Sequence, residues 1–283
     1  MTAMMPHYLS VRPEELGTGS GVKVRVVRGG LPEIGADLAQ VMFEEIEAAR
    51  GRGRPATFIV PVGPVDQYPS LAEKINAARL DCRDVCLINM DEYLADDDRW
   101  IPTDHPLSFI GYMNRLFYDR VDPELAPRQE NRIFPNPQRV QEIQKIIERR
   151  GGADVCFGGI GINGHIAFNE PPEAGQEISN ERFASLPTRC LALTPETRTI
   201  NSNTVGGEIS IIPHRAITVG MKECLGARKM RFYCNRPWQS AVVRRVLHGP
   251  ITAQCPASLL RTHPDASITV AEYVAQVPDI RLR

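Results

Sequence analysis

The sequence predicts an α/β protein with a mainly parallel central sheet that is covered by helices on both faces. Short apolar runs, each about four to six residues long, alternate with amphipathic stretches along most of the chain. The runs are apolar throughout rather than at every second position, which is typical of strands buried on both faces of a sheet. No internal repeat or low-complexity linker interrupts the alternation, and 283 residues suffice for one large domain of this class.

In the first part of the chain, the predicted strands are followed by helical patterns. The apolar residues after the first run recur at the spacing of one helix face: Ile34, Leu38, Val41, Met42 and Ile46. We expect further helices at Pro69–Arg79, Pro106–Phe117 and Pro137–Arg149. The strands expected in this part are Val22–Val27, Thr57–Val62, Val85–Asn89 and Asp154–Phe157.

The second part of the chain continues the pattern with shorter elements. We expect helices at Trp238–His248 and Ala257–Arg261, and irregular structure in residues 1–20 and in Pro123–Pro137. The organisation expected is an N-terminal extension over residues 1–21 and a single α/β domain over residues 22–283. The strands expected here are Cys190–Leu193, Ile217–Val219, Met230–Cys234 and Ser267–Val270.

Composition and charge favour a small-molecule partner. The 33 basic and 34 acidic side chains give a formal net charge of −1 without blocks of either sign, so no basic face for nucleic acid is expected. No apolar stretch reaches the roughly 20 residues needed to cross a membrane, and the first residues do not form a signal peptide. The seven cysteines are odd in number and form no close CxxC pair, which indicates reduced thiols and a cytoplasmic protein.

Three loops with unusual chemistry leave the predicted strand ends. They are Pro61–Gln67, Met90–Tyr93 and Gly158–Glu170. Ligands of open parallel sheets bind at the carboxyl ends of the strands, where such loops converge. We therefore expect one cleft that gathers four side chains from distant parts of the sequence: Asp91, Glu92, His165 and Glu170.

The third loop reads GGIGINGHIAFNEPPE over residues 158–173, and it favours a catalytic turn over a nucleotide cradle. Gly159, Gly161 and Gly164 stand at GxGxxG spacing, but His165 and an Asn-Glu-Pro-Pro sequence follow where a long helix would be needed. The imidazole of His165, with the carboxylate of Glu170 five residues later, is suited to general acid–base catalysis. The structural alternative is a hydrogen-bonded histidine in the core. Asp91 directly follows a buried strand, where it could be catalytic or cap a helix. No histidine or cysteine spacing predicts a metal site.

Several segments together resemble the glucosamine-6-phosphate deaminase (isomerase) family. The most specific are Asn89–Tyr93 (NMDEY) and Gly158–Pro171 (GGIGINGHIAFNEP), and the match runs collinearly from about residue 22 to 275. The related 6-phosphogluconolactonases share the glycine turn and histidine but not their surroundings. Further matching segments are His105–Pro123, Thr194–Ser202, Ala216–Gly220 and His263–Val270.

The resemblance implies a Rossmann-like fold and conversion of an amino-sugar phosphate to a ketose phosphate plus ammonia, without a metal or redox cofactor. It implies that Asp91 shuttles a proton between C2 and C1 of the open-chain sugar. His165 and Glu170, with Asn163 beside them, would move a proton during ring opening. Family members occur as monomers and as hexamers, so a homo-oligomer is possible.

The chain departs from the family pattern at four places. Asn163 replaces the usual aspartate of the ring-opening group; it keeps an acceptor, loses the charge, and can donate, which could set another imidazole tautomer. The phosphate-binding loop carries Pro64 and Asp66 after Gly63, while Asn203 and Gln239 replace an arginine and a lysine. These changes remove charge-assisted phosphate contacts and predict an altered specificity.

Arg236 offers a replacement anion site, because it precedes a predicted helix at a strand end. There it would hold a carboxylate or a differently placed phosphate, with Gln239 or Trp238 facing the sugar; the alternative is a surface arginine. The expected substrate contacts are thus Gly63, Glu92, Gly159, Gly161, Gly164, Arg236 and Gln239. Two other functions stay open, a sugar lactonase of the related branch and a non-catalytic sugar-binding protein.

Overall fold

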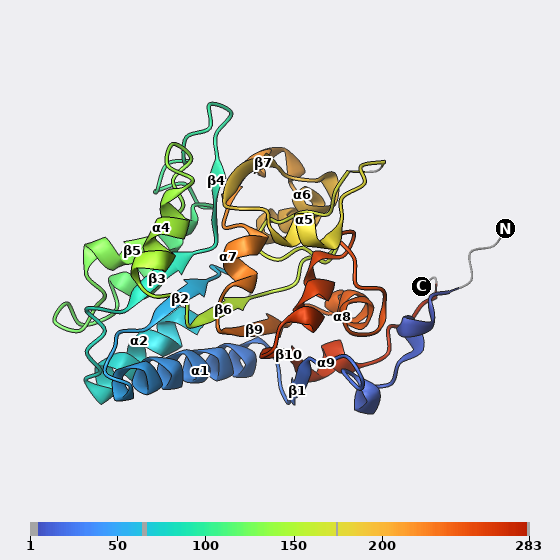
Figure 1. Cartoon of the computed structure of the whole chain (residues 1–283), viewed down its shortest axis with the longest axis horizontal. Helices are drawn as coiled ribbons and strands as arrows, with labels where there is room; N and C mark the ends of the chain where they lie inside the picture. The colour runs from blue at the N-terminus through green and yellow to red at the C-terminus, as the bar shows by residue number, and fades with distance from the viewer. Residues whose placement is uncertain (1–4, 64–66, 174, 282–283) are drawn as a thin grey trace.

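The structure of the chain is a computed structural model that describes residues 5–63, 67–173 and 175–281. Seven strands form the main sheet in the order β1-β10-β9-β6-β2-β3-β5, and every neighbouring pair is parallel. Helices α1 and α2 pack together along one side of the sheet, whereas α7 lies on the other (Figure 1). The expected parallel α/β architecture is confirmed. The strands are β1 Lys23–Val27, β2 Thr57–Val60, β3 Cys86–Asn89, β5 Arg132–Ile133, β6 Val155–Gly158, β9 Lys229–Cys234 and β10 Ala266–Ala271.

A second sheet, which was not expected from the sequence, has three antiparallel strands in the order β4-β8-β7. The runs expected at Cys190–Leu193 and Ile217–Val219 do form strands, but they pair in this sheet rather than in the parallel one. This sheet has its own apolar core, which includes Tyr93, Phe168 and Ala216. The strands are β4 Asp91–Leu94, β7 Arg189–Ala192 and β8 Arg215–Thr218.

The long helices follow the expected apolar patterns. Helix α1 buries Ile34, Leu38, Met42 and Ile46 against the main core, as their spacing predicts. The expected helix at Pro106–Phe117 is shorter and ends in a π-helical turn, Asn114–Tyr118. The α-helices are α1 Leu31–Gly51, α2 Gln67–Ala78, α3 Phe109–Met113, α4 Glu142–Arg149, α5 Asn180–Ala184, α6 Pro195–Asn201, α7 Met221–Leu225, α8 Gln239–His248 and α9 Glu272–Ala275.

Short ordered elements occur in both segments that were expected to be irregular, residues 1–20 and Pro123–Pro137. The helix expected at Ala257–Arg261 forms, but with 3-10 geometry. Strand β5 and the 3-10 turn Gln129–Asn131 lie within Pro123–Pro137, while the segment Ala257–Arg261 is part of a 3-10 helix, η7 Pro256–Thr262. No helix in the described part of the chain is both long and apolar enough to span a membrane. The other 3-10 helices are His7–Ser10, Pro13–Glu15, Ser202–Val205 and Ile209–Ile211.

A buried arginine on α8 fastens both ends of the described chain. Arg244 is 0% exposed and donates to the carbonyl oxygens of Val11 (2.8 Å), Ser240 (3.1 Å) and Ala275 (2.6 Å). Nearby, the N–H of Gly17 donates to Nε2 of His248. A buried guanidinium is costly unless its donors are used, and here carbonyl oxygens from three segments use them.

We expect Arg244→Met to lower the free energy of unfolding by roughly 2–4 kcal/mol, because it leaves buried carbonyls without donors. Lys145→Met, an exposed substitution on α4, is the matched control. Urea unfolding of the two variants and the wild type measures the difference. Equal midpoints for Arg244→Met and wild type would show that the three segments are held by apolar packing alone.

Candidate active site

Met90 connects the two sheets and thereby places Asp91. Its N–H donates to the carbonyl of Val60 in β2 (2.9 Å), and its carbonyl accepts from the N–H of Val219 after β8 (2.6 Å). Asp91, the next residue, opens β4 and pairs with Thr218. It therefore lies at the carboxyl end of β3, where parallel sheets bind ligands.

The carboxylate of Asp91 is buried without a hydrogen-bond donor. The residue is 8% exposed, and none of the described residues donates a hydrogen bond to its oxygens. Burial, with the negative charge of Glu92 adding to it, raises the pKa of Asp91 to about 8. A carboxyl group with such a pKa can both take up and release a proton near neutral pH.

Glu92 is buried and caps the start of α3, while its expected substrate contact stays a prediction. It is 0% exposed, and its oxygens accept from the N–H groups of Phe109 (3.1 Å) and Ile110 (2.8 Å) at the start of α3. The hydroxyl of Ser108 and the N–H of Tyr93 also donate to it. Burial raises the pKa of Glu92 and these donors oppose the rise. Glu92 thus fixes β4 to α3 and acts on the site through Asp91.

The glycines of the third loop make room for His165. A Cβ on Gly161 would lie 2.0 Å from Nε2 of His165, so only glycine lets the imidazole pack there. Gly164 has a positive φ of 90°, and a Cβ would come within 2.6 Å of Sγ of Cys255. Gly159 is half-buried between β6 and this turn. Ala167 also has a positive φ, 52°, and such strain in a non-glycine residue is common at functional turns.

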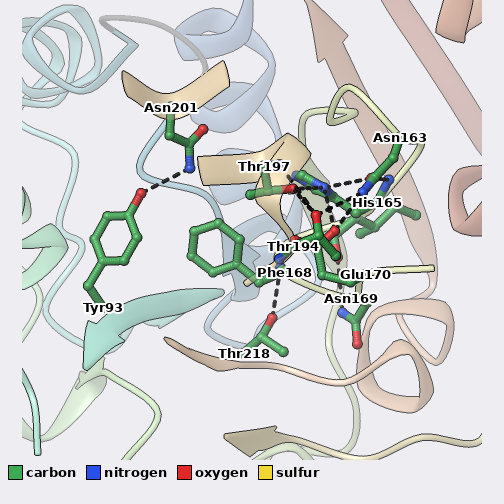
Figure 2. A network of polar contacts seen from close by, with 11 residues as sticks. Tyr93, Asn163, His165, Phe168, Asn169, Glu170, Thr194, Thr197, Asn201 and Thr218 are labelled. Atoms are coloured by element: carbon green, nitrogen blue, oxygen red, sulfur yellow. Dashed lines mark hydrogen bonds and ion pairs between the residues drawn. The ribbon is translucent and has the colours of Figure 1, made fainter. Parts of the chain in front are cut away.

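Asn163, His165 and Glu170 form one hydrogen-bonded cluster (Figure 2). Nδ2 of Asn163 donates to Oε2 of Glu170 over 2.7 Å, and Oδ1 of Asn163 lies 2.9 Å from Nδ1 of His165. Oε2 of Glu170 is 3.4 Å from the same ring nitrogen. The structure therefore brings these three predicted residues together.

This network defines the tautomer of His165. The ionised Glu170 carboxylate only accepts, so the amide nitrogen of Asn163 must face it and the amide oxygen must face the ring. Nδ1 of His165 then carries the proton, and Nε2 has none in the neutral ring. Asn163 therefore donates to Glu170 but not to the imidazole, and it selects the tautomer that a carboxylate at this position would select.

Two threonines that the sequence analysis did not identify complete the cluster. Oγ1 of Thr197 lies 3.3 Å from Nδ1 of His165, and the N–H of Thr194 donates to Oε1 of Glu170 over 3.4 Å. Burial acts to raise the pKa of Glu170, but His165 and hydrogen bonds from Asn163 and Thr197 outweigh it and lower the pKa. The Thr-Pro-Glu-Thr sequence, an N-cap threonine before a proline, was the signal available for this helix start.

The second sheet holds the turn in place. The N–H of Phe168 donates to Oγ1 of Thr218 over 3.0 Å, and the side chain of Asn169 donates to the carbonyl of Val219 over 2.8 Å. Because Thr218 pairs with Asp91, the two acid–base groups are anchored to neighbouring residues of one strand pair. The aromatic rings of Phe168 and Tyr93 pack against each other, with their centroids 5.5 Å apart, and Phe168 lies between Tyr93 and the cluster (Figure 2).

The remaining predicted contacts lie around the ends of β2 and β9. Gln239 is 3% exposed, and its Nε2 donates to the carbonyl of Ile160 while its Oε1 accepts from the N–H groups of Asn235 and Arg236, each over 2.7 Å. Its amide is therefore satisfied by backbone groups, and its contact with a sugar stays a prediction. Arg236 is exposed, and so is Gly63. Pro64 and Asp66 lie outside the described residues. Among those described, no three His, Cys, Asp or Glu side chains gather in a way that could hold a metal ion.

The burial of Asp91 predicts a stability cost. Its folded pKa lies above its ordinary value, so the native state retains the proton that the unfolded chain releases, and stability falls as pH rises toward 8. We expect Asp91→Asn to stabilise the protein by roughly 2–4 kcal/mol at pH 8 and by little at pH 4. Urea unfolding at the two pH values measures this. A stability gain that is the same at both pH values would show that ionisation of Asp91 is not its source.

Comparisons with known proteins agree with the fold. No family model matches the chain. The solved structure of a monomeric glucosamine-6-phosphate deaminase superposes with a TM-score of 0.75 at 23% identity, covering 90% of this chain and 100% of that one. A 6-phosphogluconolactonase from Thermotoga maritima superposes with a TM-score of 0.63 at 13% identity, covering 88% of this chain and 100% of that one. These similarities confirm the fold.

Similarity in sequence is higher to the deaminases. The glucosamine-6-phosphate deaminase of Thermoanaerobacter pseudethanolicus is 28% identical over 228 residues, which cover 78% of this chain and 82% of that protein. The glucosamine-6-phosphate deaminase of Cronobacter sakazakii is 30% identical over 225 residues, which cover 77% of this chain and 79% of that protein. The chain belongs to the glucosamine-6-phosphate deaminase family.

Proposed function

We propose that the protein isomerises an amino sugar, or its phosphate, from the aldose to the ketose form and releases the nitrogen as ammonia. The observation that carries this proposal is the presence of two separate acid–base groups. Asp91 has a raised pKa and no hydrogen-bond donor, whereas Glu170 has a lowered pKa and lies against His165. Two proton-transfer steps, ring opening and isomerisation, need two such groups.

In this proposal Asp91 removes the proton from C2 of the open-chain sugar and returns it to C1. The electrons of the C2–H bond form the C1=C2 bond of the enolamine while the carbonyl oxygen at C1 takes up a proton and becomes a hydroxyl. Protonation at C1 then leaves an iminium at C2, which releases a proton to give the imine. Water then adds at C2, and ammonia leaves to give the ketose. A buried carboxylate with a pKa of about 8 suits both halves of this transfer.

Ring opening is the step proposed for His165. With Nδ1 committed to Oδ1 of Asn163, its Nε2 can take the proton of the anomeric hydroxyl and pass it to the ring oxygen. Glu170 stabilises the imidazolium that forms between these two events, since its Oε2 lies 3.4 Å from Nδ1. Asn163 fixes the tautomer.

We further propose that recognition of a 6-phosphate is weakened or relocated. Gln239 is neutral and its amide is occupied by backbone groups, and Asn203 is neutral and exposed. Arg236 is the cation at the neighbouring strand end, and its exposure leaves it accessible to an anionic substituent. These observations favour an amino sugar with no phosphate or with an anionic group placed differently.

Proton NMR in D2O tests the proposed function. The purified protein is incubated with glucosamine 6-phosphate, glucosamine and a carboxylated amino sugar, and deuterium exchange at C2, ketose formation and ammonia release are followed. We expect exchange and ketose formation with at least one sugar, and loss of both by a factor of at least about 10² in Asp91→Asn. Exchange with the phosphorylated sugar only would refute the altered specificity.

The other outcomes of this experiment point elsewhere. Hydrolysis of a sugar lactone without C2 exchange, and with Asp91→Asn still active, would identify a lactonase. Binding of a sugar without exchange would identify a sugar-binding protein. Either result would overturn the proposed isomerisation.

The pKa of Asp91 predicts the pH dependence of isomerisation. Because the base form must be deprotonated and its pKa is raised to about 8, kcat/KM should rise with pH through a midpoint near 8. Initial rates of ketose formation between pH 6 and 9.5 measure the profile. A midpoint near the ordinary value of a carboxyl group, about 4, would remove Asp91 from the role of base.

Asn163→Asp tests the charge of the ring-opening cluster. The new carboxylate would lie where Nδ2 now donates to Oε2 of Glu170 over 2.7 Å, and two carboxylates at that distance must share a proton. We expect the pKa of Glu170 to rise by about one unit or more, measured by carbon-13 NMR of the carboxyl groups. An unchanged Glu170 titration would show that the cluster rearranges around the new charge.

A further inference from the structure

We propose that Thr197 is a positioning residue of this site, whose buried hydroxyl holds the Glu170 carboxylate and the His165 imidazole in the arrangement that ring opening needs. Thr197 lies on α6, far in sequence from the glycine turn, and its side chain reaches the cluster from the opposite side to Asn163 (Figure 2). The kinetic part of this inference rests on the proposed function. The part that concerns Glu170 does not.

The position of Thr197 is set by the start of α6. Thr194 caps this helix, and its Oγ1 accepts from the N–H of Thr197 over 3.3 Å. Thr197 is 0% exposed, so its hydroxyl has no access to solvent and must find partners within the protein. The partners within reach are Oγ1 of Thr194 at 3.3 Å, Nδ1 of His165 at 3.3 Å and the carboxylate of Glu170.

The direction of these hydrogen bonds follows from the rest of the cluster. The proton on Nδ1 of His165 has its shortest contact with Oδ1 of Asn163, at 2.9 Å. Oγ1 of Thr194 donates to Oγ1 of Thr197, so the proton of Thr197 is free to donate onward. Glu170 is the acceptor, and this hydrogen bond is one of the causes that lower the pKa of Glu170. The hydroxyl thus has both the imidazole, 3.3 Å away at Nδ1, and the carboxylate of Glu170 as partners.

The surroundings leave few other charges to fix this geometry. The titratable group facing Glu170 from its own turn is His165, and the partners from the turn and α6 are the neutral side chains of Asn163 and Thr197 and the N–H of Thr194. Arg198, also on α6, donates instead to the carbonyls of Ile209 and Ile212. Loss of one neutral donor should therefore raise the pKa of Glu170, because no described cation hydrogen-bonds to its carboxylate.

Matched variants on one helix provide the test. Thr197→Val and Thr197→Ala remove the hydroxyl with and without the branched side chain, and Thr197→Ser keeps it. Thr199→Val, on the exposed face of α6, is the control. The protein is labelled with δ-13C glutamate, the Glu170 signal is assigned with Glu170→Gln, and its titration is recorded in the full chain. Thermal unfolding verifies that each variant is folded.

We expect the pKa of Glu170 to rise by about half a unit or more in Thr197→Val and Thr197→Ala, and to stay at the wild-type value in Thr197→Ser and Thr199→Val. In the exchange assay, kcat should fall about tenfold in the two hydroxyl-free variants with KM changed less than about twofold, and Thr197→Ser should restore it. A Glu170 titration in Thr197→Val and Thr197→Ala that matches wild type would overturn the inference. Absence of exchange in the wild type would refute the proposed function alone, since the titration still decides the role of Thr197.

Discussion

The shared backbone of Met90 is the constraint on which the site depends. A residue that donates to the parallel sheet and accepts from the antiparallel one cannot shift without breaking a hydrogen bond in each. It therefore fixes the point at which the chain leaves the main sheet, and Asp91 is held at that point. The same antiparallel sheet binds the turn that carries His165, through Thr218 and Val219. One small sheet thus sets the geometry of both acid–base groups.

The pKa values of Asp91 and Glu170 are shifted in opposite directions because the two carboxyl groups have different surroundings, although the same antiparallel sheet anchors both segments. Asp91 is buried beside the charge of Glu92, with no donor from the described residues, so its neutral form is favoured. Glu170 is equally buried, at 8% exposed, but four side-chain or backbone partners favour its charged form. Burial alone therefore does not decide which carboxyl group can release a proton near neutral pH; the number of donors does. This contrast favours the neutral form of Asp91 and the charged form of Glu170 near neutral pH.

The parallel fold and the cluster of His165 and Glu170 were predictable because they depend on local patterns. Continuous apolar runs identify buried strands, and the ends of parallel strands converge, which predicts that Asp91 lies on the same side of the sheet as this cluster. The antiparallel sheet was not predictable, because a short apolar run does not reveal which strand it pairs with. The capping role of Glu92 and the backbone contacts of Gln239 were not predictable for a similar reason. The polarity of both side chains was visible, but the backbone N–H and carbonyl groups that bind them belong to other segments of the chain or to a turn whose shape no pattern reveals. Thr197 was missed because its hydroxyl gains a role only through the packing of α6 against the turn.

The asparagine at position 163 is compatible with this geometry for a physical reason. Its Nδ2 donates to the Glu170 carboxylate, which can only accept, and its Oδ1 accepts from the ring N–H of His165. An aspartate here would meet Glu170 at 2.7 Å with two like charges, and the pair would have to retain a proton. The amide satisfies both neighbours without that proton, so the hydrogen bonds persist while Glu170 stays ionised. What the asparagine gives up is one negative charge beside the imidazole, which leaves Glu170 as the carboxylate next to Nδ1 of His165. The arrangement of the cluster is thus kept with one negative charge where an aspartate would bring a second, and the orientation of Glu170 becomes correspondingly more important.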